Sequence, residues 1–70
     1  MDLPPIEELR ILAAWFEKWY GLDWRRQLCR DAGLTYIFLT NRLLGRCAVS
    51  TRFLSKLHDV RATLLFNSRA

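Results

Sequence analysis

Apolar residues recur at intervals of three and four along most of this 70-residue chain, with polar residues between them. Such spacing places apolar side chains on one side of a helix, because one helical turn takes 3.6 residues. The pattern predicts four helices, over residues 5–20, 24–32, 36–44 and about 51–65. We therefore expect an all-α fold, a compact bundle of four or five helices that contains a helix-turn-helix, in a single domain spanning residues 1–70.

The first predicted helix is unusually aromatic, with Trp15, Phe16 and Trp19 close together. It begins at Pro5, a residue that the first helical turn tolerates, and it ends before Gly21. Its aromatic side chains either fill the core of a small domain or form part of a dimer contact, since aromatic residues are common at interface centres. The sequence leaves both interpretations open.

The second and third helices are joined by only three residues, Gly33, Leu34 and Thr35. Glycine has no Cβ and so suits a left-handed residue at a helix end, after which Leu34 can fold back onto the preceding helix. Asp23 is expected to cap the second helix, Thr35 the third and Ser50 the fourth. Two helices joined by so tight a glycine turn are typical of a helix-turn-helix.

Spacing around the turn carries further information. A small residue, Cys29, stands four positions before Gly33, an aliphatic residue, Leu39, stands six after it, and Gly45 closes the third helix. In these positions the segment 24–57 resembles the lambda-repressor-like helix-turn-helix family, of the Cro/CI or XRE type. The resemblance implies that the third helix enters the DNA major groove, that the second crosses the backbone, and that a homodimer binds an inverted-repeat operator.

The same resemblance implies which side chains contact DNA. Base contacts are implied for five residues of the third helix and its cap: Thr35, Tyr36, Ile37, Thr40 and Asn41. Phosphate contacts are implied for eight others: Arg25, Arg26, Gln27, Arg30, Arg42, Arg46, Ser50 and Arg52. The chemistry agrees, because asparagine can bond both N6 and N7 of adenine and arginine can bind phosphate through two parallel hydrogen bonds.

Charge is distributed unevenly along the chain, whose net charge is +4. Residues 1–21 hold four acidic and two basic side chains, a net charge of −2, whereas residues 22–70 hold nine basic and three acidic ones, a net charge of +6. The half that contains the helix-turn-helix is thus the basic half, as a polyanionic partner requires. We therefore expect a small sequence-specific transcription regulator of bacterial or phage type, with double-stranded DNA as its partner.

Two features of the third helix keep alternatives open. Residues 36–38, Tyr-Ile-Phe, are unusually apolar for a helix in a polar groove, so some of them are buried or they contact a protein. The alternative function is accordingly a protein interaction module, a small phage-type inhibitor or adaptor on the same scaffold. Arg42 either packs its aliphatic stem inward while its guanidinium reaches water or phosphate, or lies on a helix rotated so that Leu43 and Leu44 take the core.

Several functions are not expected. Cys29 fits a core position, and Cys47 and the single histidine, His58, complete no zinc site. No glycine-rich phosphate loop or carboxylate pair accompanies them, so we expect no enzyme, no cofactor and no small-molecule ligand. No apolar run approaches the roughly 20 residues that span a bilayer, which favours a cytoplasmic protein without a membrane partner.

The chain ends are expected to be short and flexible, at residues 1–4 and 67–70. Just before the second of these, Leu64, Leu65 and Phe66 form an apolar cluster that would be costly to expose, which hints at self-association. His58 is expected to be a half-buried packing residue, since no nucleophile motif stands beside it.

Overall fold

The first residues predicted for the four helices agree with the structure. The computed structural model describes residues 4–69, which form four helices and no strand, so the predicted all-α fold is confirmed. The helices are α1 Pro5–Tyr20, α2 Trp24–Ala32, α3 Tyr36–Leu43 and α4 Thr51–Arg69.

Two helix ends differ from the expectation. α3 ends one residue earlier than predicted, and α4 runs on to Arg69 rather than stopping near residue 65. Neither glycine nor proline interrupts the chain after Ser50, so nothing in the sequence stops α4 sooner. Residues 67–69 therefore continue the helix, while residues 1–3 and 70 of the expected flexible ends lie outside the described part of the chain.

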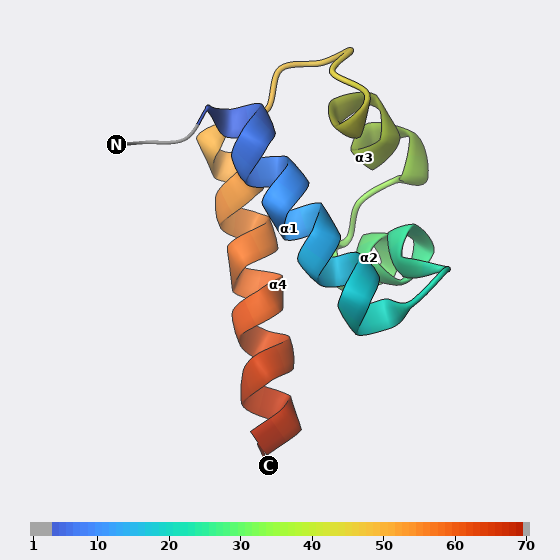
Figure 1. The fold of residues 1–70 in the computed structure, drawn as a ribbon, viewed down its shortest axis with the longest axis vertical. Helices are drawn as coiled ribbons and strands as arrows, with labels where there is room; N and C mark the ends of the chain where they lie inside the picture. The colour runs from blue at the N-terminus through green and yellow to red at the C-terminus, as the bar shows by residue number, and fades with distance from the viewer. Residues whose placement is uncertain (1–3, 70) are drawn as a thin grey trace.

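α1 and α2 hold the bundle together, because each of them contacts the other three helices. In Figure 1, α4 runs beside α1, whereas α2 and α3 lie on the other side of α1. The last turns of α4 extend beyond the rest of the molecule. The described chain measures 36 × 29 × 19 Å. In the same view, α3 lies at the edge of the bundle.

All four helices contribute to one hydrophobic core. Fully burying a large apolar side chain stabilises a fold by roughly 1.5–3 kcal/mol relative to leaving it exposed. Cys29 is among the buried residues, as expected, whereas Cys47 is an exposed free thiol. The core consists of Leu9, Leu12, Phe16, Trp24, Leu28, Cys29, Ala32, Leu39, Phe53, Leu54 and Leu57. Because Leu39 is its only member from α3, most of α3 is left accessible.

The turn between α2 and α3 has the predicted geometry. Gly33 is left-handed, with φ of 70°, and the Leu34 amide donates to the Cys29 carbonyl oxygen at 2.9 Å. The Thr35 hydroxyl accepts a hydrogen bond from the Phe38 amide at 3.2 Å, so its predicted capping role is confirmed. Both ends of the turn are thus fixed by local hydrogen bonds.

The other two predicted caps differ from each other. Ser50 caps α4, because its hydroxyl accepts from the Phe53 amide at 3.1 Å. Asp23 precedes α2 as expected, but its side chain forms no capping hydrogen bond among residues 4–69. Its backbone, at φ −97° and ψ 28°, is not extended as a capping residue requires, and its carboxylate lies 3.9 Å from Arg26 Nε instead.

Two polar contacts join α1 to its neighbours. Tyr20 donates its phenolic hydrogen to Asp31 Oδ2 of α2 at 2.5 Å, and burial, followed by this contact with the carboxylate, raises the Tyr20 pKa above its usual value. On the α4 side, His58 Nε2 lies 3.6 Å from Glu8 Oε2. His58 is half-buried, which confirms its expected packing position.

Candidate nucleic-acid interface

α3 presents its outer face to solvent along its whole length. Ile37 is 71% exposed, and Leu44, just past the helix end, is 61% exposed. Asn41 lies between them on the same face, one turn from each, and is partly exposed. Leu39 anchors the opposite face in the core. A flat or concave partner can therefore reach this face without any rearrangement of the bundle.

The amino-terminal end of α3 meets the amino-terminal end of α2. Thr35 and Tyr36 are both exposed there, and Arg25 Nη1 lies 3.5 Å from the Tyr36 phenolic oxygen. A shallow hollow of about 240 Å³ opens at this junction, lined by Leu22, Asp23, Arg25, Arg26 and Tyr36. Two guanidinium groups against the one carboxylate of Asp23 leave the hollow with a net positive charge, which favours an anionic group such as a phosphate.

Thr40 is placed differently from the other implied base contacts. Its Oγ1 is buried and has no hydrogen-bond partner within residues 4–69. Because Thr40 directly follows the buried Leu39, it lies on the flank of α3 rather than at the centre of its outer face. The hydroxyl does not face solvent, and we leave Thr40 out of the proposed base contacts.

Arg42 lies against protein rather than projecting into solvent. Its Cζ is 3.4 Å from the centre of the Phe38 ring and 5.6 Å from that of Phe53, and its Nη1 donates to the Phe38 carbonyl oxygen at 3.2 Å. Leu43 packs against the core, whereas Leu44 is exposed. The structure differs from both alternatives read from the sequence, because the guanidinium lies on Phe38 rather than reaching water or phosphate, and only Leu43 of the two leucines packs against the core. Arg42 is therefore not among the proposed phosphate contacts.

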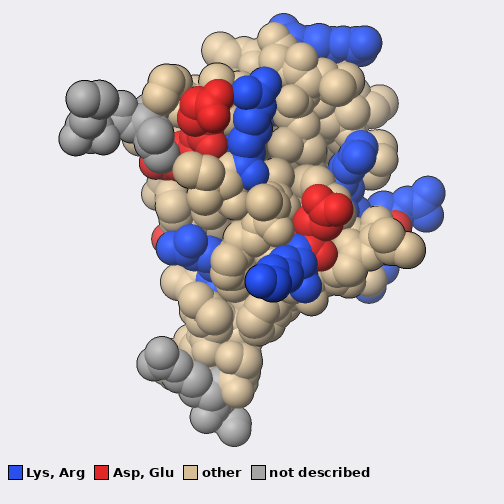
Figure 2. Space-filling view, in the orientation of Figure 1, with Lys and Arg blue, Asp and Glu red and all other residues tan. Residues whose placement is uncertain are grey.

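The remaining implied phosphate contacts surround α3. Arg26 and Arg30 are exposed on α2, Arg46 is exposed in the loop after α3, and Arg52 is exposed on the first turn of α4. Figure 2 shows Lys and Arg side chains projecting from the edge of the molecule over α2 and α3. Gln27 is half-buried, and the Ser50 hydroxyl is occupied by its capping bond. Exposed cations from three elements thus flank one exposed helix.

Sequence reasoning missed two residues at this surface. Lys56 of α4 lines a small depression with Arg52 and Phe38, so it adds a cation on the α4 side of α3. The signal was available, because residues four apart share one helix face. Leu22 stands fully exposed in the turn before α2, at the hollow beside Arg25, and no local pattern would have singled it out.

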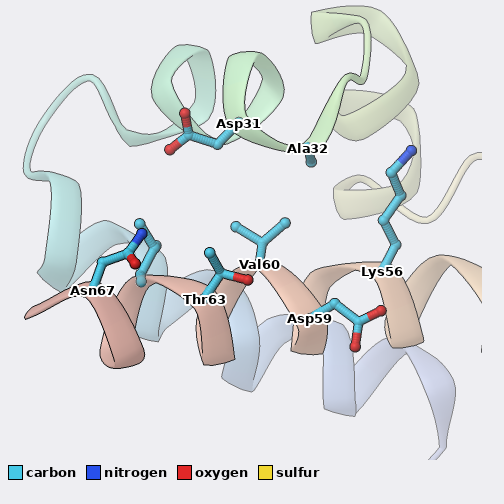
Figure 3. Close-up of a pocket in the computed structure, with 8 residues that line it drawn as sticks. Asp31, Ala32, Lys56, Asp59, Val60, Thr63 and Asn67 are labelled. Atoms are coloured by element: carbon cyan, nitrogen blue, oxygen red, sulfur yellow. The ribbon is translucent and has the colours of Figure 1, made fainter.

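A separate cleft of about 400 Å³ lies between α2 and α4. In Figure 3, Ala32 and Val60 point toward one another across it, and Lys56 rises from α4 beside them. None of the residues implied in DNA contact belongs to its lining, which consists of Asp31, Ala32, Lys56, Asp59, Val60, Thr63, Leu64 and Asn67. The cleft shares Lys56 with the depression beside Arg52, but no residue of α3 lines it.

Comparison with known proteins adds no assignment: no family model, curated protein or solved structure matches this chain. Among residues 4–69, no group of three or more His, Cys, Asp or Glu side chains is arranged to hold a metal ion. None of the helices in this range is long and apolar enough to cross a membrane. The functional argument accordingly rests on the surface around α3.

Proposed function

We propose that this protein is a small sequence-specific DNA-binding regulator that places α3 in the major groove. The observation that carries the proposal is the combination of one exposed helix face with exposed cations on the three elements around it. A major groove about 12 Å wide admits an α-helix, and the flanking phosphates then lie where such cations can reach them.

In this proposal, the exposed arginines bind the DNA phosphates. Arg25 and Arg26 line the hollow at the start of α2 and would hold one phosphate there. Arg46 follows the other end of α3, and Arg52 lines the depression beside Phe38, so both would meet the DNA backbone away from that first phosphate. These contacts position the protein and make its affinity fall as salt rises, but they read no sequence.

Side chains on the outer face of α3 would contact the bases. Asn41 is the one polar side chain near its centre, and its amide can pair with adenine N6 and N7. Ile37, fully accessible beside it, can contact a thymine methyl group. Thr35 and Tyr36 supply hydroxyl groups at the end of α3 nearest the phosphate hollow. This set favours a site rich in A·T base pairs.

The proposed regulator binds as a homodimer to an inverted repeat. A two-fold axis would place the two α3 helices about one turn of DNA apart, roughly 34 Å. Because a dimer contacts two half-sites, the ratio of its affinities for the correct and the wrong sequence is the square of the ratio for one half-site. This matters here because Asn41 is the one polar side chain near the centre of the outer face.

Fluorescence anisotropy with random-sequence duplexes across a salt series tests the proposal first, followed by selection of a preferred site from that pool. We expect binding at low salt that weakens steeply as salt rises, and a preferred sequence with two-fold symmetry. Asn41→Ala should lower the free-energy difference between the preferred base and the other bases by about 1–3 kcal/mol at one position of each half-site. Asn67→Ala, at the α2–α4 cleft, is the matched control and should change nothing. Equal affinity of the wild type for selected and scrambled DNA would rule the proposal out.

One observation favours a second candidate, a protein interaction module. The outer face of α3 is bordered by the exposed apolar side chains of Ile37 and Leu44, with only Asn41 between them. A partner protein would bury these side chains in a hydrophobic groove. This alternative predicts no DNA binding even at low salt. It also predicts a stoichiometric complex with a partner protein that survives nuclease treatment and that the Ile37→Asp variant no longer forms.

A further inference from the structure

The cleft between α2 and α4 has an apolar floor that belongs to the packed bundle. Ala32 of α2 is buried in the core, and Val60 and Leu64 of α4 pack against the core. The cleft holds about 400 Å³, which is within the range of roughly 300–1,000 Å³ that is usual for sites that bind small molecules. A ligand in this cleft would therefore lie on a surface whose shape the bundle already holds.

The two ends of the cleft carry opposite charges. In Figure 3, the Asp31 carboxylate extends from α2 on the side of Asn67, whereas the Lys56 ammonium rises from α4 at the other end. Within residues 4–69, Lys56 forms no ion pair. Two neighbouring charges do not cancel this polarity: the Asp59 carboxylate points along α4 rather than toward α2, and Arg30, next to Asp31, is not part of the lining. The cleft is thus negative at one end and positive at the other.

Neighbouring side chains support both ends. Tyr20 of α1 donates its phenolic hydrogen to Asp31 Oδ2, which orients the carboxylate and leaves Oδ1 to accept from a ligand. At the other end, Arg52, one turn before Lys56 on α4, lines the adjoining depression with it and adds a second positive charge. A carboxylate that is already oriented loses less entropy when a ligand binds to it.

The length of the cleft suits a short extended chain. Lys56 and Asn67, near its two ends, are separated by about 16 Å along α4, at roughly 1.5 Å per residue. An extended chain of three residues spans about 10 Å, and a charge-assisted hydrogen bond of roughly 3 Å at each end accounts for the rest. A single amino acid is too short, because its ammonium and carboxylate groups are attached to one carbon.

We propose that this cleft binds a tripeptide with free ends and an apolar central side chain. Its ammonium group donates to Asp31, its carboxylate accepts from Lys56, and its central side chain lies on the apolar floor at Val60. Thr63 and Asn67 also line the cleft, and their hydroxyl and amide groups can both donate to and accept from the peptide groups of the ligand. The opposite charges at the two ends determine the direction in which the peptide lies.

No local pattern in the sequence predicts this cleft, because its lining combines residues of α2 and α4 that are far apart along the chain. The proposal therefore replaces the expectation that the protein has no small-molecule ligand. It goes beyond the proposed function and does not depend on it, since no residue of α3 lines the cleft and peptide binding is measured without DNA.

Titration of the ¹⁵N-labelled full chain with alanyl-leucyl-alanine, followed by NMR, tests the proposal. We expect a dissociation constant of roughly 0.1–1 mM, because Asp31 and Lys56 are exposed and solvent screens both ion pairs. The largest chemical-shift changes should occur at the backbone amides of residues that line the cleft. No change at ten times the upper limit of that range, or changes centred on α3, would overturn the proposal.

Blocked peptides and charge variants test the two ends of the cleft separately. Acetylation of the amino group of the peptide, or amidation of its carboxylate, should each weaken binding about two- to fivefold. Asp31→Asn keeps an acceptor for Tyr20 but removes the charge. It should therefore weaken binding of the free peptide by the same factor and leave binding of the acetylated peptide unchanged. Lys56→Gln should behave in the same way toward the free and the amidated peptide.

Glu17→Gln and Lys18→Gln are the matched controls, because both residues are exposed charges on α1 that do not line the cleft, and neither change should alter the affinity. Equal losses in these control variants would contradict binding between Asp31 and Lys56. A peptide blocked at both ends that binds as tightly as the free one would also contradict it, because the charges of the ligand would then play no part.

Discussion

Arg42 Cζ lies 3.4 Å from the centre of the Phe38 ring, and its Nη1 donates a hydrogen bond to the carbonyl oxygen of the same residue. The Phe38 ring in turn lies 5.5 Å from that of Phe53 on α4. These three side chains connect α3 to α4. Leu39 is the only fully buried residue of α3, so this contact with α4 adds to the contacts that α3 makes with α1 and α2.

Arg42→Ala should therefore lower stability without changing the electrostatics of DNA binding. We expect a loss of about 1 kcal/mol in the free energy of unfolding, from the lost cation–π contact and the lost packing of the stem. Arg42→Lys should recover only part of it, since a lysine ammonium lacks the planar group that stacks. Urea titration measures the loss. A salt dependence of DNA affinity reduced by about one unit would show instead that Arg42 swings out to a phosphate.

Thr40→Val removes a buried hydroxyl that has no partner within the described chain. Replacing such a group by a methyl of the same shape relieves an unpaired polar atom, so we expect stability unchanged or raised by up to about 1 kcal/mol. DNA affinity should not change. Thr35→Val is the informative comparison, because it removes the cap of α3 and should cost about 1 kcal/mol. A destabilised Thr40→Val protein would mean that the hydroxyl has a partner.

How much of this fold the sequence predicts depends on how local each feature is. The left-handed turn at Gly33 and the cap at Thr35 follow from residue chemistry within four positions, and both were predicted correctly. Asp23 has the right chemistry for a cap but the wrong backbone angles, which the whole turn between α1 and α2 determines. Cys29 was assigned to the core correctly, because its spacing places it on the inward side of α2.

The candidate site was harder to predict, because its details depend on contacts between helices. The sequence left two orientations open for Arg42, and the structure has neither in full, because the guanidinium lies against Phe38 with the ring of Phe53, on another helix, close by. It could not show that the Thr40 hydroxyl is buried. Ile11 was hidden among many apolar residues of α1, and only the packing of the bundle shows that it is left outside.

The burial of Tyr20, together with its contact with Asp31, should make the protein less stable at high pH. The Tyr20 pKa is raised in the folded protein, so the neutral phenol is favoured there relative to the unfolded chain. This contribution is fully present below the unfolded phenol pKa of about 10 and is lost as pH rises through the folded value. Tyr20→Phe should cost about 1 kcal/mol at pH 7, where the hydrogen bond is lost.

Above pH 10 the wild type and Tyr20→Phe should converge in their free energy of unfolding, as measured by urea titration at a series of pH values. Tyr36→Phe is the control for tyrosine ionisation elsewhere, and it should keep the wild-type fall in stability. If the wild type and Tyr20→Phe stayed separated by a constant difference up to pH 12, the phenol would not be what titrates.

Arg26→Ala should weaken DNA binding uniformly across sequences and reduce its salt dependence. Arg26 lines the hollow beside α3 and carries one of the cations that would neutralise a phosphate, so the slope of log affinity against log salt should fall by about one unit. Arg10→Ala is the matched control, because Arg10 is also an exposed cation with an acidic neighbour, Glu7, but lies on α1 outside the proposed interface. Anisotropy titrations at four or more salt concentrations measure both slopes. Equal losses in the two variants would mean that only net charge attracts DNA and that the hollow holds no particular phosphate.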